Sequence, residues 1–103
     1  KMTEKDVAAI QEITSLYDTY CEQRDQAFET LQFELTQRGI KPTTTPLENA
    51  KALAATGENG IQRALYLYSR YMIANANTHM IMDLAHNLAN VTGKNFQLGI
   101  PKG

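Results

Sequence analysis

The chain has 103 residues, with ten lysines and arginines against eleven aspartates and glutamates, so its formal net charge is −1. A chain of this length fits one domain, and we expect residues 1–103 to form a single domain. The hydrophobic fraction of 43% excludes wholesale disorder, and the balanced charge argues against a general polyanion binder. No apolar run is long enough to cross a membrane. Cys21 is the single cysteine and cannot form an internal disulfide, so we expect a cytoplasmic protein.

A long first helix is predicted over about residues 4–38. Thr3 can cap its N-terminus, with Asp6 three residues later in a box-like position. No glycine or proline interrupts the chain from there to Arg38, and Gly39 followed by Pro42 gives a stop signal. Apolar residues recur between these ends with a helical period: Ile10, Ile13, Tyr17, Tyr20, Cys21, Phe28, Leu31 and Leu35.

A short second helix is predicted over about residues 46–56. Thr45 can cap it, Pro46 suits the first helical position, and Glu48 would complete a capping box with Thr45. Gly57 is expected to end this helix, and residues 57–60 have the composition of a turn.

A long third helix is predicted over about residues 60–92, ending at Gly93. It carries two adjacent apolar stripes, which together predict a wide buried face. The residues that follow, 93–103, contain alternating apolar side chains and are expected to form an extended tail against the helices, with a free tail as the alternative. The fold class is therefore all-α, with two long helices and one short helix in a helical hairpin or bundle. The first stripe is Ala64, Leu67, Tyr71, Ala74, Thr78, Ile81, Ala85 and Leu88, and the second is Ile61, Leu65, Tyr68, Met72, Asn75, His79, Met82, His86 and Ala89.

Acidic and basic residues are segregated along the chain. Residues 3–38 hold eight acids and three bases, whereas residues 39–103 hold three acids and six bases. Either the acidic helix pairs with basic parts of its own chain, or it presents an acidic face to a basic partner. The first interpretation is the simpler one.

The third helix is poor in charge near its C-terminal end. Between residues 71 and 93 the only formally charged side chain is Asp83, although a helix in contact with water normally carries lysine and glutamate there. We therefore predict that a second copy covers this helix, in the simplest case in a homodimer that completes a larger bundle. The predicted interaction face is Tyr68, Tyr71, Met72, Asn75, His79, Met82 and His86.

One cluster has residue types that bind metals. His79, Asp83 and His86 are spaced four and three residues apart, which places them along one helical face. Two imidazoles and a carboxylate are suitable ligands for zinc or iron, so a metal-binding bundle or a metal-dependent enzyme is one alternative. The simpler alternative is a structural role for all three residues. A pH-responsive interface involving the two histidines is a third.

An aromatic and basic cluster in the third helix suggests a further alternative, a helical dimer that binds DNA or RNA. Helical spacing scatters its members, and the net charge disfavours nucleic acid as a partner, so core and interface tyrosines are the simpler interpretation. The aromatic and basic cluster consists of Arg63, Tyr66, Tyr68, Arg70 and Tyr71.

The chain has no Gly-rich phosphate loop and no nucleophile elbow, and we expect neither an enzyme nor a cofactor. The leading hypothesis is a non-catalytic protein–protein interaction module: a regulator, inhibitor, adaptor or chaperone.

Overall fold

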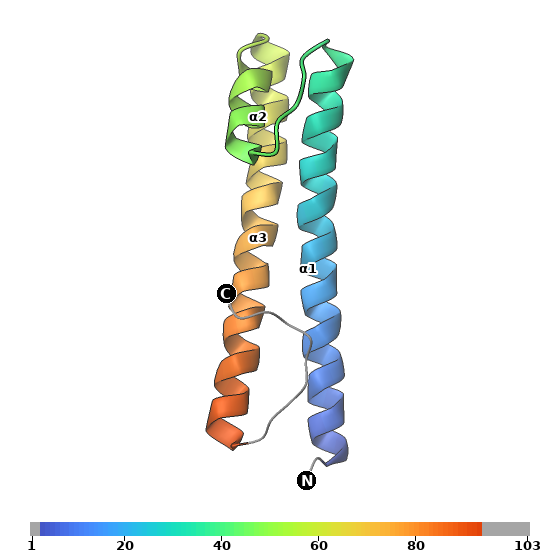
Figure 1. The fold of residues 1–103 in the computed structure, drawn as a ribbon, viewed down its shortest axis with the longest axis vertical. Coiled ribbons are helices and arrows are strands. Elements are labelled where there is room, and N and C mark those ends of the chain that lie inside the picture. Colours follow the sequence, from blue (N-terminus) through green and yellow to red (C-terminus); the bar gives the residue numbers. More distant parts are fainter. Residues whose placement is uncertain (1–2, 94–103) are drawn as a thin grey trace. The chain divides into compact units, whose positions relative to one another are not determined.

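The computed structural model describes residues 3–93, and these residues form three α-helices and no strand. The helices are α1 (Glu4–Gln37), α2 (Pro46–Ala54) and α3 (Glu58–Thr92), as Figure 1 shows. The predicted all-α fold with two long helices and one short helix is confirmed. The predicted extended tail follows Gly93 and lies outside the described residues.

The chain divides into two compact units, which are described separately. One unit contains residues 22–74, namely the C-terminal part of α1, the loop, α2 and the first part of α3. The other contains residues 1–21 and 75–103, of which 3–21 and 75–93 are described. None of the helices in the described part is long and apolar enough to cross a membrane.

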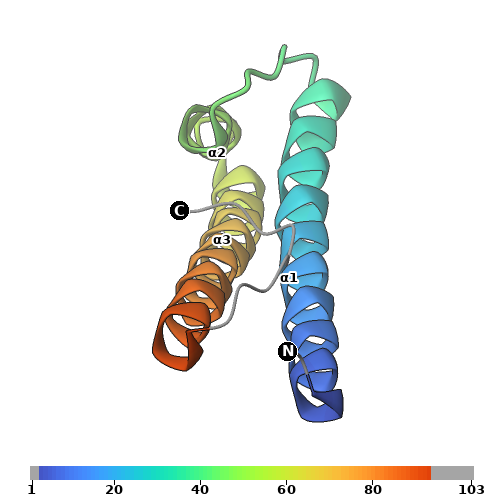
Figure 2. The same ribbon diagram turned by 60° about the horizontal axis from the view of Figure 1, so that its bottom comes forward.

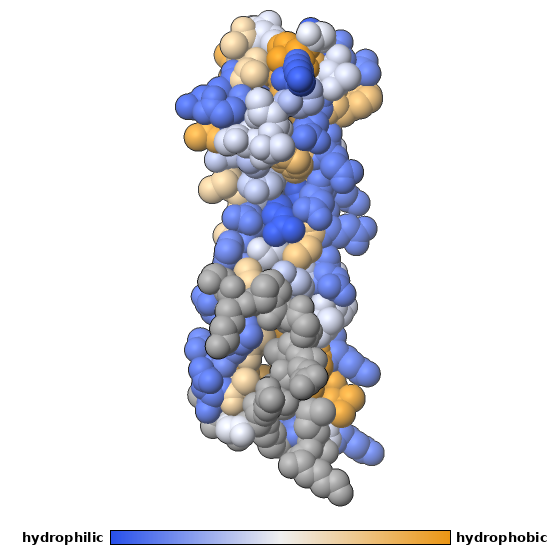
Figure 3. Space-filling view, viewed as in Figure 1, coloured by the Kyte–Doolittle hydropathy of each residue, from blue (hydrophilic) through white to orange (hydrophobic). Residues whose placement is uncertain are grey.

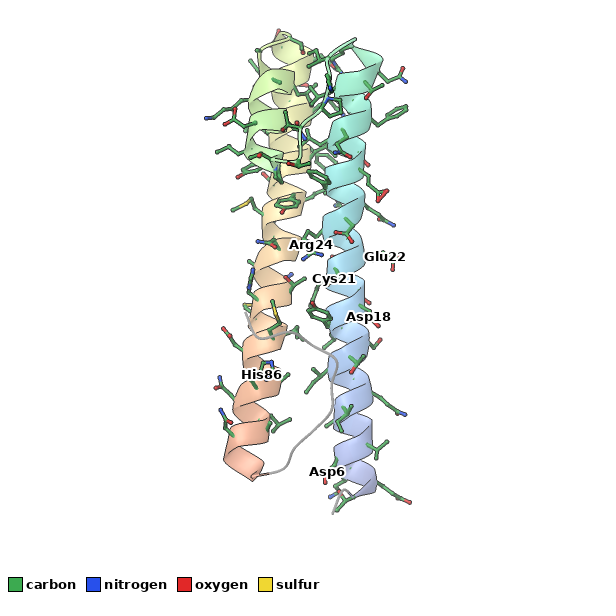
Figure 4. All side chains as sticks on the ribbon, viewed as in Figure 1. Asp6, Asp18, Cys21, Glu22, Arg24 and His86 are labelled. Carbon is green, nitrogen blue, oxygen red and sulfur yellow. The ribbon has the colours of Figure 1, made fainter. Side chains whose placement is uncertain are left out.

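The N-terminus of α1 is closed by the predicted capping box. The Thr3 hydroxyl accepts a hydrogen bond from the Asp6 amide at 3.2 Å, and the Asp6 carboxylate accepts one from the Thr3 amide at 2.9 Å. Two backbone donors that the first helical turn would leave unpaired are thereby satisfied. Figure 4 labels Asp6 at this end of α1.

The C-terminus of α1 is closed at Gly39, also as predicted. Gly39 has φ of +75°, its amide donates to the Thr36 carbonyl at 3.0 Å, and the Ile40 amide donates to the Leu35 carbonyl at 2.9 Å. These two bonds form a Schellman motif, in which glycine avoids the strain of the left-handed conformation. Ile40 then packs against the core that contains Leu35, so the motif also directs the loop inward.

The predicted capping box of α2 is wrong. Thr45 has extended backbone angles, but its side chain makes no capping hydrogen bond. Asn49, which is 1% exposed, organises this corner instead: its side-chain oxygen accepts from the Thr43 amide at 2.8 Å and from the Thr43 hydroxyl at 3.0 Å. The Asn49 amide group also donates to the Thr43 carbonyl at 2.9 Å. The loop is therefore held by a side chain from inside the helix rather than by its N-cap.

The corner between α2 and α3 is tighter than predicted. The Thr56 amide and hydroxyl both donate to the Leu53 carbonyl, and this turn ends α2 at Ala54 instead of residue 56. The Ile61 amide donates to the Gly57 carbonyl at 2.9 Å, so α3 begins at Glu58 rather than at Gly60. Gly60 is buried, and a Cβ there would overlap the Leu53 carbonyl oxygen and the Thr56 hydroxyl. Only glycine fits at this crossing.

Each unit has its own hydrophobic core. In residues 22–74, α2 lies beside the start of α3 (Figures 1 and 2), and side chains from α1, α2 and α3 form one cluster. In the other unit, the first part of α1 contributes one buried residue and the last part of α3 contributes three. The clusters are Leu31, Leu35, Ala50, Leu53, Ala64 and Leu67 in residues 22–74, and Ile13, Ile81, Met82 and Ala85 in the other unit.

The first apolar stripe of α3 is buried as predicted, because all eight of its residues are buried or half-buried. The second stripe is not covered uniformly: Ile61, Leu65, Met72 and His79 are exposed, and Met82 is buried. Within a single chain the first stripe is covered and the second is covered only in part, so the predicted wide buried face is incomplete there.

Candidate interaction site

An apolar groove runs between α2 and α3 in the unit of residues 22–74. It has a volume of about 240 Å³. Ala50 and Ala54 lie along its α2 side, and Ile61, Leu65 and Tyr68 along its α3 side. Small alanine side chains on α2 leave the larger side chains of α3 without cover, which makes a groove where a larger residue would have filled the space. Leu47, Lys51, Ala64 and Ser69 complete the lining.

The rim of the groove is apolar and accessible. Leu65 is 66% exposed, the most exposed large hydrophobic residue in the described part of the chain, and Ile61 and Leu47 are 46% and 43% exposed. Figure 3 shows apolar side chains, in orange, at the surface over the end of the ribbon that carries α2. Grouped apolar side chains of this kind mark contact surfaces more often than scattered ones do.

Tyr68 connects the groove to the aromatic interior of this unit. Its ring stacks on Tyr71, with centroids 6.4 Å apart and an interplanar angle of 14°. Tyr71 in turn lies 6.3 Å from Phe28 of α1 in a tilted arrangement. Tyr68 and Tyr71 are half-buried, and Met72 on the next turn is exposed. Of the predicted interaction face, these three residues lie in the unit of the groove, but only Tyr68 lines it.

The remaining predicted face residues lie in the other unit and differ in exposure. His79 is exposed, Asn75 and His86 are half-buried, and Met82 packs in the core with Ile13. The Asn75 carbonyl accepts a hydrogen bond from the buried Thr78 hydroxyl at 2.6 Å. The exposed side chains of α3 in this unit include Met80 and Leu84, which the sequence analysis did not select.

The predicted metal ligands do not converge. Asp83 and His79 are exposed, whereas His86, labelled in Figure 4, has a buried Nε2 atom that no described residue hydrogen-bonds. Among residues 3–93 no three histidine, cysteine, aspartate or glutamate side chains are grouped so that they could hold a metal ion.

In the unit of residues 22–74, an ion-pair network connects α1 with the first part of α3. The Glu34 carboxylate accepts hydrogen bonds from Arg38 at 2.6 Å and from Arg63 Nε and Nη2 at 3.2 and 3.1 Å. Arg38 also donates to Asn59 at 2.8 Å. The hydrogen bond from Arg38, reinforced by Arg63 and opposed by burial, lowers the pKa of Glu34 below its usual 4.5. This network is a case of the predicted pairing of the acidic helix with bases of its own chain.

The residues that the sequence analysis missed are those of α2. Leu47, Ala50 and Ala54 follow a helical spacing of three and four, but a nine-residue helix with three alanines gives a weak signal. Comparisons with known protein families, with curated proteins and with solved structures gave no match. The groove is therefore interpreted from its own chemistry.

Proposed function

We propose that this chain is a small, non-catalytic α-helical protein–protein interaction module that acts as a homo-oligomer. It is of the regulator, inhibitor, adaptor or chaperone type, and a second copy of the chain covers the α2–α3 groove. The observation that carries the proposal is the position of Leu65. This leucine is 66% exposed and stands at the rim of an apolar groove that is large enough to receive such a side chain.

The protruding Leu65 side chain and the α2–α3 groove lie on the same patch, which favours a second copy of the chain over an unrelated partner. In a two-fold interface the same surface is used by both subunits, so each patch must be complementary to itself. With Leu65 of each copy in the groove of the other, both grooves are filled and both leucines are buried. Transfer of a leucine side chain from water stabilises association by roughly 1.5–3 kcal/mol per residue.

The lining of the groove supports the same occupant. Lys51 is the only formally charged residue along it, and its ammonium already lies 3.7 Å from Glu48. Ile61 and Leu47, which also line the groove and are exposed, extend the apolar contact. Charged side chains are depleted at the centres of interfaces, which fits this composition.

The test is the mass of the particle in solution. Sedimentation equilibrium over micromolar to millimolar concentrations should give a mass above the 11.5 kDa of one chain. Leu65→Glu should weaken association by roughly tenfold or more, because it would bury an unpaired charge. Phe33→Glu is the matched control, since Phe33 is 60% exposed on α1 of the same unit and does not line the groove. A monomer at every concentration, or equal weakening by both variants, would refute the proposal.

A further inference from the structure

A second concave site lies between α1 and α3 in the unit of residues 22–74, and its chemistry differs from that of the groove. It has a volume of about 220 Å³. Buried Ala27 and Leu67 form its floor. Its α1 side presents the neutral polar side chains Gln23, Gln26 and Thr30.

The α3 side of this cleft carries two arginines on one tyrosine. The guanidinium carbon of Arg63 lies 5.6 Å from the centre of the Tyr66 ring, and that of Arg70 lies 5.5 Å from it. Cation–π contacts at these distances hold each guanidinium in place. Tyr66 is exposed, so it does not belong to the core of this unit.

The two arginines differ in how their charge is compensated. Arg63 donates two hydrogen bonds to the Glu34 carboxylate. Arg70 forms no salt bridge with any carboxylate of the described residues. The cleft therefore has one positioned guanidinium whose charge is not balanced, beside amide and hydroxyl groups that can donate hydrogen bonds.

We propose that this cleft binds a single oxyanion group, a carboxylate or a phosphate. Arg70 is its principal donor, and Gln23 or Gln26 supplies a further hydrogen bond. A planar guanidinium can hold two oxygens of either group with parallel hydrogen bonds. Tyr66 keeps the Arg70 guanidinium oriented before the ligand arrives, which reduces the cost of ordering it.

A single group is favoured over a nucleic acid because the surrounding charge is balanced. Residues 22–74 hold six acidic and six basic side chains. A nucleic acid backbone is bound through several phosphates at once, which needs an excess of lysine and arginine. The site is also independent of the α2–α3 groove, because none of its lining residues lines that groove.

The test is a titration followed by NMR through the arginine Nε–Hε signals. Sodium phosphate and sodium acetate are added separately, with sodium chloride at matched ionic strength as the reference. Saturable shifts of the Arg70 signal with phosphate, with acetate or with both support the site, and the stronger ligand identifies the source of the oxyanion. Equal shifts with chloride, or no saturation, would overturn it.

Two variants make the test specific. Arg70→Gln should weaken binding by about tenfold or more, because a charge-assisted hydrogen bond is lost. Lys41→Gln removes one positive charge from the loop before α2 in the same unit, at a residue that lines neither the cleft nor the groove, and should leave binding unchanged. Equal loss in both variants would overturn the site, as would a single-stranded oligonucleotide that binds about a hundredfold more tightly than inorganic phosphate. Circular dichroism of both variants should match the wild type, since both side chains are exposed.

Discussion

Glu34 and Arg63 are 29 residues apart in the chain, and the Glu34 carboxylate accepts two hydrogen bonds from the Arg63 guanidinium at 3.1 and 3.2 Å. With the 2.6 Å bond from Arg38, the carboxylate links α1 to the first part of α3. Both partners keep part of their surface in water, so the pair is only partly desolvated. A partly buried contact, in which two guanidinium N–H groups donate to one carboxylate oxygen, stabilises more than an exposed ion pair does.

Replacement of Glu34 with glutamine should destabilise the fold by roughly 1–2 kcal/mol at neutral pH, because the ion pairs with Arg38 and Arg63 become contacts between a charged arginine and a neutral amide. Chemical denaturation followed by circular dichroism measures the change. Glu48→Gln is the control, since Glu48 forms an exposed pair with Lys51 at 3.7 Å and its loss should cost little. An equal loss in the two variants would show that the Glu34 network contributes nothing specific.

The same carboxylate should make stability depend on pH. Because the pKa of Glu34 is lowered in the folded state, chiefly by the hydrogen bond from Arg38, its ionised form stabilises the fold at pH values above 4.5. This contribution is lost as the pH falls from 4.5 through the lower folded pKa. The difference in unfolding free energy between wild type and Glu34→Gln should therefore shrink over that range. A difference that stays constant down to low pH would contradict the assignment.

Gly60→Ala should destabilise the chain by roughly 1–3 kcal/mol, since the added methyl group would overlap the Leu53 carbonyl oxygen and the Thr56 hydroxyl. The helix propensity of alanine opposes this effect but is smaller than the steric cost. Thermal unfolding of the variant measures the balance. Gln62→Ala, at an exposed position on the same helix, should change stability by less than about 0.5 kcal/mol. A Gly60→Ala variant as stable as wild type would mean that α2 and α3 do not cross this closely.

Asn49→Ala and Thr45→Ala form a pair that separates two ways of starting α2. The first should cost roughly 1–3 kcal/mol, because it removes three hydrogen bonds to Thr43 and takes away the side chain that accepts from the Thr43 amide. The second should have little effect, because the Thr45 side chain makes no capping bond. Urea denaturation of both variants measures the two costs. The reverse order of stability would restore the capping box that the sequence predicts.

Features set by a few neighbouring residues could be predicted from the sequence. The box formed by Thr3 and Asp6, the stop at Gly39 and the buried stripe through Leu67 and Ile81 depend on local chemistry and helical period alone. The start of α2 at Pro46 was also predicted, but the bonds that hold it were not, because Asn49 bonds to a residue in a loop whose path is set by packing.

The candidate sites were less predictable than the helices. Tyr68 was selected from its stripe, but the groove beside it exists only because α2 packs on α3. The contacts of Tyr66 with Arg63 and Arg70 were also missed, since the sequence analysis treated the tyrosines as one scattered set. In both cases the missing information was the placement of one helix against another.

The buried glycine at the α2–α3 crossing has a consequence for motion. With Gly60 in direct contact with the last turn of α2, that helix cannot pivot as a hinged flap over the groove. Amide protons of Leu53 and Ala64 should accordingly exchange with deuterium as one cooperative group, at the rate of the whole corner. A partner that binds the groove would therefore find a preformed surface, and binding would not require α2 to open first.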